Sequence, residues 1–452
     1  MHSVKLTIAK FLSVLFVICG LQFGAKAQEN SPYSRYGLGD LTPNRNILSR
    51  GMGGIAAGVS NNVYRFETQS LNFTNPASLA NIYNTVFDIG IEADFRTLKS
   101  SVPAKKFNSA NIYFPYLQLG FPLTTPKMRK KEISWAMSFG LRPVTKINYK
   151  VEKNVELFPD SLDLNTLYEG SGGVNQAFIG TGLRIKNFSL GINAGYMFGS
   201  KSYSTKLTFL NDTTFFYLSN SETKTTFGGL FISGGMQYEY ILKKQPGKMP
   251  KILRFGLYGN FAQNLRASKD IIRETIYYDP NGGYYRLDSV YENKDVKGKI
   301  KFPAMVGVGF IYQDANWFYG ADFEYGNWSN YRDYGQADAV KSNWVIRAGA
   351  EYLPAKEGAP EKKFFRKSRY RAGLYYGSDY ISINKNRPEY GFTLGTGMPL
   401  TRSNNYTGDV VLNTALEIGN RGNKQTNLRE NIVRFSIGIS MNARWFLKPK
   451  YN

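Results

Sequence analysis

The sequence predicts an all-β fold, a transmembrane antiparallel β-barrel of about 14 strands with an N-terminal plug. The first observation is that segments in which apolar and polar residues alternate recur from about residue 83 onward. The second is that no run of 18 apolar residues follows the first 27, so no membrane-spanning helix is expected. The third is a composition with 15% aromatic residues and 45 glycines, which is typical of membrane-spanning barrels.

Residues 1–27 are predicted to be a signal peptide. Two lysines accompany the apolar stretch 11–23, and Ala25-Lys26-Ala27 supplies the small residues of a cleavage site. A lipoprotein signal at Cys19 is disfavoured because the residue before it is bulky. The mature chain is therefore expected to be exported.

Cleavage would leave a chain with neither histidine nor cysteine, because His2 and Cys19 are the only ones. This excludes histidine acid–base catalysis, thiol nucleophiles, disulfides and His/Cys metal sites. We expect no catalytic residue, no metal and no cofactor, and we do not expect an enzyme. Cleavage would also remove three lysines and no acid, which lowers the formal net charge from +23 to +20. An exported protein rarely meets nucleic acid, so we expect anionic lipid or polysaccharide as its partner.

The clearest strand is the last one. Between Val433 and Trp445 the odd positions are apolar and the even positions are small or polar, as a strand between lipid and a polar lumen requires. The same alternation predicts strands near 83–98, 107–122, 132–149, 173–186, 188–206, 224–242, 251–270, 300–313, 316–330, 343–354, 368–382, 390–400, 408–419 and 430–446. The even number suits a barrel whose two chain ends lie on the same side of the membrane.

The connections support this arrangement. Those after even-numbered strands are short, whereas 150–172, 207–223 and 271–299 follow odd-numbered strands and are long, as outer loops are. Basic clusters occur at the short turns, including 127–131 and 243–251. These clusters are either solvated turn charges or a periplasmic surface for an acidic protein partner.

Residues 28–82 do not alternate. They contain Gly51, Gly53 and Gly54, followed by Asn75-Pro76-Ala77. The glycines lack the preceding strand and the following Lys-Ser/Thr of a nucleotide-binding loop, so a structural turn is favoured. We expect a plug, or hatch, folded into the barrel formed by residues 83–452; a flexible periplasmic arm is the alternative.

Three passages resemble the FadL-like family of outer-membrane transporters, which includes long-chain fatty-acid and toluene-type importers. They are Ser49–Gly54 with Asn75–Ala80, Phe302–Gly309 leading to Trp317–Tyr331, and Ile346–Tyr352 with Tyr370–Tyr375. The opening Ser31–Asp40 also resembles exported barrels of Bacteroidetes-type bacteria.

The resemblance implies a plugged barrel of fourteen strands in the outer membrane of a Gram-negative cell. It also implies passive uptake of small hydrophobic molecules, which leave through a lateral opening beside a kinked third strand. Pro143 interrupts the predicted third strand and either marks that opening or forms a simple bulge.

The long loops 150–172 and 271–299 differ from that family because they lack an apolar helical stretch. A PorV-like branch of the same fold does not transport, and serves instead as an adaptor for protein secretion. The alternative function is therefore a non-transporting adaptor or an accessory subunit of an outer-membrane secretion or assembly complex.

Charged residues are predicted on the lumenal face of several strands. Paired acids could hold calcium or act as a glycosidase, but a polar lumen lined with arginines favours a structural network that also anchors the hatch. The predicted network comprises Glu92, Asp94, Arg142, Arg254, Asp322, Glu324, Arg347 and Arg434. The expected partners are outer-membrane lipid and lipopolysaccharide, a hydrophobic small molecule, and envelope proteins at the periplasmic rim, with no nucleic acid.

Overall fold

The structure, a computed structural model, describes most of the chain. The described residues are 31–61, 69–101, 104–158, 162–210, 217–244, 246, 248–278, 284–356, 363–383, 385–401, 409–423 and 428–443. The predicted signal peptide lies outside these residues, as does the end of the predicted last strand. None of the described helices is long and apolar enough to cross a membrane.

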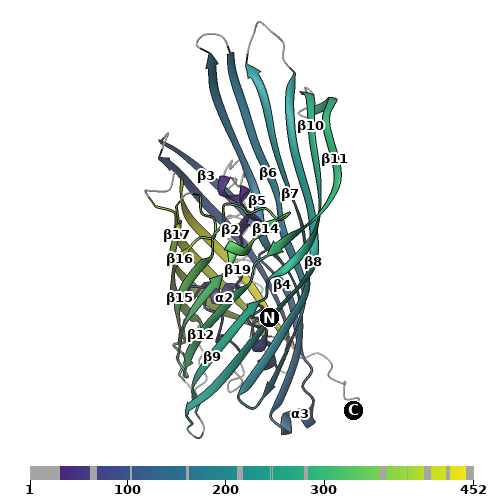
Figure 1. The fold of residues 1–452 in the computed structure, drawn as a ribbon. Helices are drawn as coiled ribbons and strands as arrows, with labels where there is room; N and C mark the ends of the chain where they lie inside the picture. The colour runs from purple at the N-terminus through teal and green to yellow at the C-terminus, as the bar shows by residue number, and fades with distance from the viewer. Residues whose placement is uncertain are drawn as a thin grey trace, which may run out of the picture.

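The described residues form one closed barrel of fourteen antiparallel strands (Figure 1). Three of these strands are interrupted, and each of those carries two labels. The wall elements are β2 (Thr85–Ser101), β3 (Ala104–Tyr113), β4 (Leu117–Pro122), β5 (Ile133–Phe158), β6 (Leu162–Ile185), β7 (Phe188–Leu210), β8 (Leu218–Lys243), β9 (Lys251–Asn260), β10 (Gln263–Tyr278), β11 (Tyr284–Phe302), β12 (Met305–Gln313), β13 (Trp317–Gly326), β15 (Asn343–Tyr352), β16 (Arg369–Ser378), β17 (Pro388–Thr401), β18 (Asp409–Arg421) and β19 (Leu428–Ala443). The barrel closes where β19 pairs with β2. The predicted antiparallel β-barrel of about 14 strands is confirmed.

The alternating pattern places apolar side chains outside and polar side chains inside. Along β19, Val433 and Phe435 are exposed on the outer face, whereas Arg434, Ser436 and Ser440 are buried in the lumen. The pattern arises because successive side chains of a strand point to opposite faces.

One side of the barrel is much taller than the other. β5 and β8 each contain 26 residues, whereas β13, β15 and β16 each contain 10. Figure 1 shows β5 to β8, β10 and β11 rising above the remaining strands. The prediction of loops at 150–172, 207–223 and 271–299 is therefore wrong for most of these residues, which continue the strands. In the upper part of β11 residues are exposed on both faces, so no apolar alternation marks the strand there.

The wall has a seam between β3 and β5. The predicted strand 107–122 breaks at Phe114–Tyr116, so β3 pairs with β2 while β4 pairs with β5 only up to Leu141. Beyond that point, the partner of β5 on the seam side is β1 (Asp40–Leu41), with Leu41 opposite Thr145. Pro143 lies at the start of the seam, at a shift in the register between β5 and β6.

Residues 31–61 and 69–82 are largely buried and lie against the inner wall; we call them the inner segment. The segment contains η1 (Pro32–Arg35), β1, α2 (Ile47–Arg50) and η2 (Pro76–Asn81). The remaining short elements are η3 (Trp328–Asn330), β14 (Arg332–Asp333), α3 (Pro126–Lys130) and α4 (Phe364–Lys367). Of these, α3 and α4 lie in turns at the end of the barrel opposite the tall hairpins.

Candidate functional site

The glycine turn Gly51–Gly54 of the inner segment packs tightly against the wall. Gly53 and Gly54 have φ angles of 68° and 84°, in the left-handed region that favours glycine. The amide of Gly53 donates a hydrogen bond of 2.8 Å to Oγ1 of Thr393. A Cβ atom on Gly53 would lie only 2.6 Å from the carbonyl oxygen of Ala348. Only glycine therefore fits between this turn and the wall.

The Asn75-Pro76-Ala77 turn lies against β7 and β8. The side-chain amide of Asn75 donates to the carbonyl of Ala57 over 2.7 Å, and its oxygen accepts the amide of Ala77 over 3.2 Å, which caps η2. A Cβ atom on the wall residue Gly191 would lie 2.2 Å from the carbonyl carbon of Pro76. The turn therefore contributes to the close fit of the inner segment.

A first charge cluster joins the inner segment to β2, β18 and β19. Arg50 of α2 forms ion pairs with Glu92 and Glu417, the second over 3.2 Å. Arg434 contacts Glu417 at 2.8 Å and Asp94 at 3.3 Å. All five side chains are buried, so each charge depends on its partners.

A second cluster holds β1 at the seam. Asp40 forms ion pairs with Arg96 of β2 and with Arg421 of β18, the latter over 2.6 Å. Arg421 also contacts Glu389 at 3.2 Å. Asp40 thus attaches the short strand β1 to the strands on the other side of the seam, in addition to its pairing with β5.

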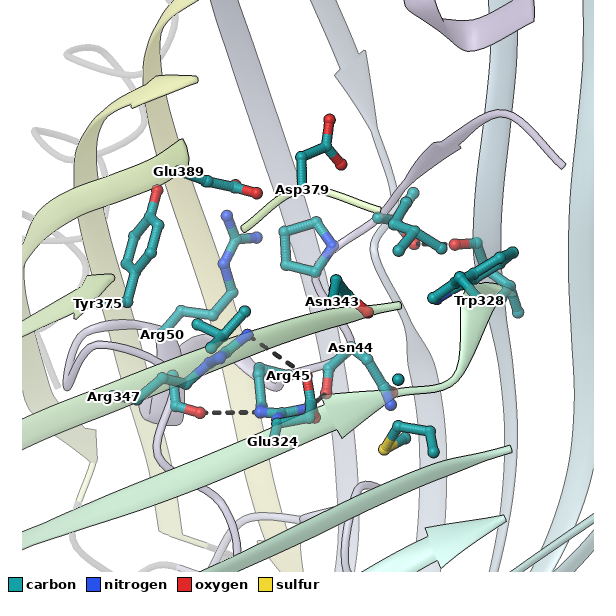
Figure 2. A pocket seen from close by; sticks show the side chains of 18 of the residues that line it. Asn44, Arg45, Arg50, Glu324, Trp328, Asn343, Arg347, Tyr375, Asp379 and Glu389 are labelled. Carbon is teal, nitrogen blue, oxygen red and sulfur yellow. Dashed lines mark hydrogen bonds and ion pairs between the residues drawn. The ribbon is translucent and has the colours of Figure 1, made fainter. Parts of the chain in front are cut away.

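A third cluster forms around Glu324 (Figure 2). Its carboxylate accepts Arg45 of the inner segment at 2.6 Å and the hydroxyl of Tyr258 at 2.8 Å, and Arg347 lies 3.6 Å away. The neighbouring Asp322 accepts two backbone amides of the inner segment, at 2.6 and 2.8 Å. Both acids therefore bind the inner segment to β13.

A cavity of about 210 Å³, which we call the chamber, lies beside these clusters. Its charged lining includes Arg45, Arg50, Glu324, Arg347, Glu417, Arg421 and Arg434. Its apolar lining includes Val144, Met197, Phe231, Phe302 and Trp328, which belong to one continuous apolar cluster. An apolar cavity of about 150 Å³ can hold benzene, so the chamber has room for a substituted ring compound.

Three residues of the inner segment separate the chamber from the seam. Leu41, Thr42 and Pro43 line both the chamber and a smaller cavity of about 20 Å³ within the seam. The hydroxyl of Thr42 donates to the carbonyl of Pro143 over 2.8 Å. We call Leu41–Pro43 the partition.

An apolar groove of about 560 Å³ lies on the outer face, beside the lower end of the seam. Its lining includes Leu117 and Leu141, the last residue pair between β4 and β5. The small side chains of Ala177 and Ala194 contribute to the hollow among larger apolar neighbours. The groove would face lipid if the barrel spans a membrane.

Two of the predicted lumenal arginines lie apart from the three clusters. Arg254 forms an ion pair with Glu239, with 3.1 Å between Nε and Oε2. Arg142 donates to the side chains of Gln176, over 2.9 Å, and Asn44. Within the described part of the chain no carboxylate pairs with Arg142, which also lines the chamber.

The comparisons with known proteins give the family of the chain. The sequence profile of the BamG family matches residues 7–452. The chain belongs to the BamG family. No curated protein matches it in sequence.

Solved structures resemble this BamG-family protein in fold. The toluene transporter TbuX of Ralstonia pickettii aligns with a TM-score of 0.52 and 15% identity, over 88% of this chain and 98% of that chain. A FadL homologue of Pseudomonas aeruginosa has a TM-score of 0.52 and 13% identity, over 90% and 100%. The monoaromatic hydrocarbon channel CymD has a TM-score of 0.50 and 15% identity, over 88% and 98%. The predicted resemblance to FadL-like barrels is confirmed for the fold, whereas the resemblance to Bacteroidetes-type barrels stays a prediction.

Several site residues of this BamG-family protein were not predicted. The missed residues are Asp40, Arg45, Arg50, Arg96, Glu239, Glu417 and Arg421. Glu417 lies in the predicted strand 408–419, and Arg421 keeps the same even spacing two residues beyond its predicted end, so a slightly longer strand would have placed both in the lumen. Nothing comparable marks Arg45 and Arg50, because the inner segment has no strand periodicity. Among the described residues no group of three or more His, Cys, Asp or Glu side chains could hold a metal ion.

Proposed function

We propose that this BamG-family protein is an outer-membrane barrel that takes up small hydrophobic molecules through the chamber and the seam. The observation that carries the proposal is the position of the partition, which lines both cavities. The inner segment acts as the plug, because its fit to the wall glycines and its buried ion pairs close the lumen below the chamber. The solved structures with this fold include proteins named as toluene and hydrocarbon channels.

The outer surface supports a location in a membrane. Large apolar side chains are exposed along most of the wall, for example Phe139, Leu190, Phe255 and Ile346. A belt of this kind is far larger than the apolar patches of soluble proteins and is typical of barrels surrounded by lipid.

In the proposed route a molecule enters from the side of the tall hairpins and rests against Phe231, Phe302 and Trp328. It then passes the partition when β1 separates from β5, and it reaches the lipid through the seam beside Pro143. Proline has no amide hydrogen, so it does not restore strand pairing at this edge. Diffusion along such a route requires no energy source and no catalytic residue.

The chamber also indicates the class of ligand. Its volume suits a ring compound with a short substituent, and its apolar lining suits the ring. Arg142 contributes a positive charge that no described carboxylate neutralises, so an apolar compound with one anionic group is expected to bind more tightly than a neutral one.

A disulfide across β1 and β5 tests the route. Leu41 and Thr145 lie directly opposite each other, and paired antiparallel residues are close enough for a disulfide. In proteoliposomes, the oxidised double variant Leu41→Cys/Thr145→Cys is expected to lose uptake of toluene and benzoate, and reduction is expected to restore it.

The matched control joins two strands that already form part of the wall. Ile418 and Val433 are also directly opposed, so a disulfide between cysteines at these positions should leave uptake unchanged. Equal uptake by the oxidised and reduced partition variants would reject the proposed route.

A second candidate function, an accessory subunit of an envelope complex, is favoured by the tall hairpins. A strand of 26 residues spans about 85 Å and, tilted in a barrel, exceeds an apolar membrane band of about 25 Å. Near the tip of β10 and β11, Tyr285 is 61% exposed and Val290 is 77% exposed. Exposed aromatic and aliphatic residues outside the membrane are typical of surfaces that another protein covers.

Crosslinking in cells and uptake by the purified chain distinguish the two candidates. A photo-crosslinking amino acid in place of Tyr285, near the tip of β10 and β11, would capture a protein partner in intact cells if the hairpins dock one. Uptake by the purified chain alone, blocked by the partition disulfide, would support transport. Absence of uptake together with a specific crosslinked partner would favour the accessory subunit.

A further inference from the structure

The turns at the end opposite the tall hairpins are strongly basic. The helix α3 contains Lys127, Arg129 and Lys130, all exposed. The turn between β8 and β9 begins at Lys243 and ends at Lys251, and its described charged residues are all lysines. In the described parts of the turns that follow β4, β6, β8, β12 and β15, only Glu132 and Asp314 are acidic. We call this set of turns the basic collar.

Aromatic side chains lie on the outer surface next to the collar. Trp317 and Tyr352, near the turns after β12 and β15, are exposed, and their ring centroids are 4.6 Å apart. Tyr240, close to the lysines that end β8, and Trp135, close to α3, are also exposed. Tryptophan and tyrosine in these positions are typical of the interface between the apolar core and the lipid headgroups. The basic residues just beyond them therefore lie at the level of the lipid phosphates.

The local structure of the turns presents the charges outward. In α3, the hydroxyl of Thr125 accepts the amide of Met128 over 3.3 Å, and the following helical turn leaves its basic side chains in solvent. In α4, Phe365 is 74% exposed next to Arg366. An exposed aromatic ring beside a cation is typical of a segment that rests in a membrane interface.

We infer that the basic collar binds the anionic headgroups of phospholipids in the leaflet that surrounds this end of the barrel. The inference rests on the proposed membrane location but not on transport. Four of the five described turns in the collar carry basic residues, and these turns are distributed over strands from β4 to β16. Lipid surrounds a barrel on all sides, whereas one acidic protein would cover a single sector. The distribution therefore favours lipid.

The test compares anionic and neutral lipid around the reconstituted chain. Spin-labelled phosphatidylglycerol and phosphatidylcholine are added to phosphatidylcholine vesicles that contain the barrel, and the immobilised fraction of each is measured. The wild type is expected to prefer phosphatidylglycerol several-fold. The variant Lys127→Gln/Arg129→Gln/Lys130→Gln is expected to reduce this preference, by up to about fivefold for each charge that contacts a headgroup. Raising the salt to 0.5 M is expected to reduce it further, since ionic strength screens exposed charges.

The matched control removes three exposed lysines at the other end of the barrel. Lys99, Lys105 and Lys106 lie on the β2–β3 hairpin, so their replacement by glutamine should leave the lipid preference unchanged. An equal loss in both variants, or no preference in the wild type, would overturn the inference. Binding of polyglutamate without a lipid preference would instead identify the collar as a protein-docking surface. Failure of the wild type to insert into vesicles would reject the membrane location and this inference with it.

Discussion

Gly53 fixes the fit between the inner segment and the wall through both its backbone angle and its missing side chain. Gly53→Ala is expected to lose stability from the positive φ angle of 68° and from the contact of its Cβ with Ala348. Gly335→Ala is the control, because Gly335 has a φ of 80° but no atom within 4 Å of its Cβ position. We expect a loss of about 1–2 kcal/mol for the control and a clearly larger loss at Gly53, measured by urea unfolding in lipid vesicles. Equal losses would contradict the tight fit.

Arg50 neutralises two buried acids at once. Arg50→Met would leave Glu92 and Glu417 with one fewer cation in a buried cluster, and we expect a loss of about 3–5 kcal/mol in the free energy of unfolding. The double variant Arg50→Met/Glu417→Gln should recover part of this loss, because it removes one of the two acids. The control Lys297→Met, in an exposed pair with Asp295, should leave stability unchanged. A stability equal to wild type in Arg50→Met would show that the cluster does not anchor the inner segment.

Strand periodicity predicts which way a charged side chain points, but not which partner it meets. Glu92, Asp94 and Arg434 were expected in the lumen, and the structure brings them together. Their grouping with Arg50 depends on the path of the inner segment, which has no periodicity to read. Arg142 was expected within the same network, yet it lies apart with neutral partners. The face to which a side chain points can therefore be predicted from one strand. The partner that it contacts depends on the register of several strands.

At the scale of elements, the sequence predicts strands well where lipid and lumen impose opposite polarities. The predicted strand at 343–354 lies close to β15, at Asn343–Tyr352. The prediction of strands fails where the two faces do not differ in polarity. An example is β11, whose residues are exposed on both faces for most of its length. The break at Phe114–Tyr116 was missed because alternation continues on both sides of it. A local signal was nevertheless present, because Pro115 lies in the break and has no amide hydrogen to donate to a neighbouring strand.

The partition should be held in place mainly by Asp40. Asp40→Asn removes the charge that pairs with Arg96 and Arg421, so β1 should separate from β5 more often. We expect faster amide hydrogen exchange at residues 39–42 and faster uptake of the proposed ligands. The matched control is Asp333→Asn, which weakens an ion pair with Lys201 in the outer part of the barrel. Unchanged exchange at β1 in the Asp40 variant would mean that its two-residue pairing with β5 is sufficient.

The tall hairpins contain an ion pair between Glu169 and Lys206 that we expect to depend on pH. Partial burial raises the pKa of Glu169, but the hydrogen bond and charge of Lys206 outweigh it, so the pKa lies below the ordinary value of 4.5. Because the pKa is lower in the folded state, the ion pair stabilises the contact between β6 and β7 when the pH is above the ordinary pKa of 4.5. This stabilisation is lost as the pH falls through the folded-state pKa. We expect weaker exchange protection of β6 and β7 below about pH 4. In Glu169→Gln this extra pH dependence should be absent.

At the scale of the whole molecule, the wall and the inner segment form one unit, while the tall hairpins extend beyond it. The three charge clusters connect the inner segment to strands on several sides of the barrel. Length and alternation alone predict the barrel. The N-terminal region does not alternate, which indicates a segment that is not part of the barrel wall. The height of one side could not be predicted, because the outer parts of these hairpins have the composition of polar loops.

The hairpins can therefore be shortened without disturbing the barrel. Glu274 and Ser289 are directly opposed in β10 and β11, so residues 275–288 can be replaced by an Asn-Gly turn. We expect this variant to keep the heat-modifiable migration of a folded barrel and to keep uptake, while losing any crosslinked partner of the β10–β11 tip. The control shortens β5 and β6 in the same way, joining Val151 to Tyr168, which are also opposed. It should retain both uptake and the crosslinked partner, because it leaves Tyr285 and the tip of β10 and β11 in place. Loss of uptake only in the β10–β11 variant would mean that the tip contributes to the route of the transported molecule and is not solely a docking surface.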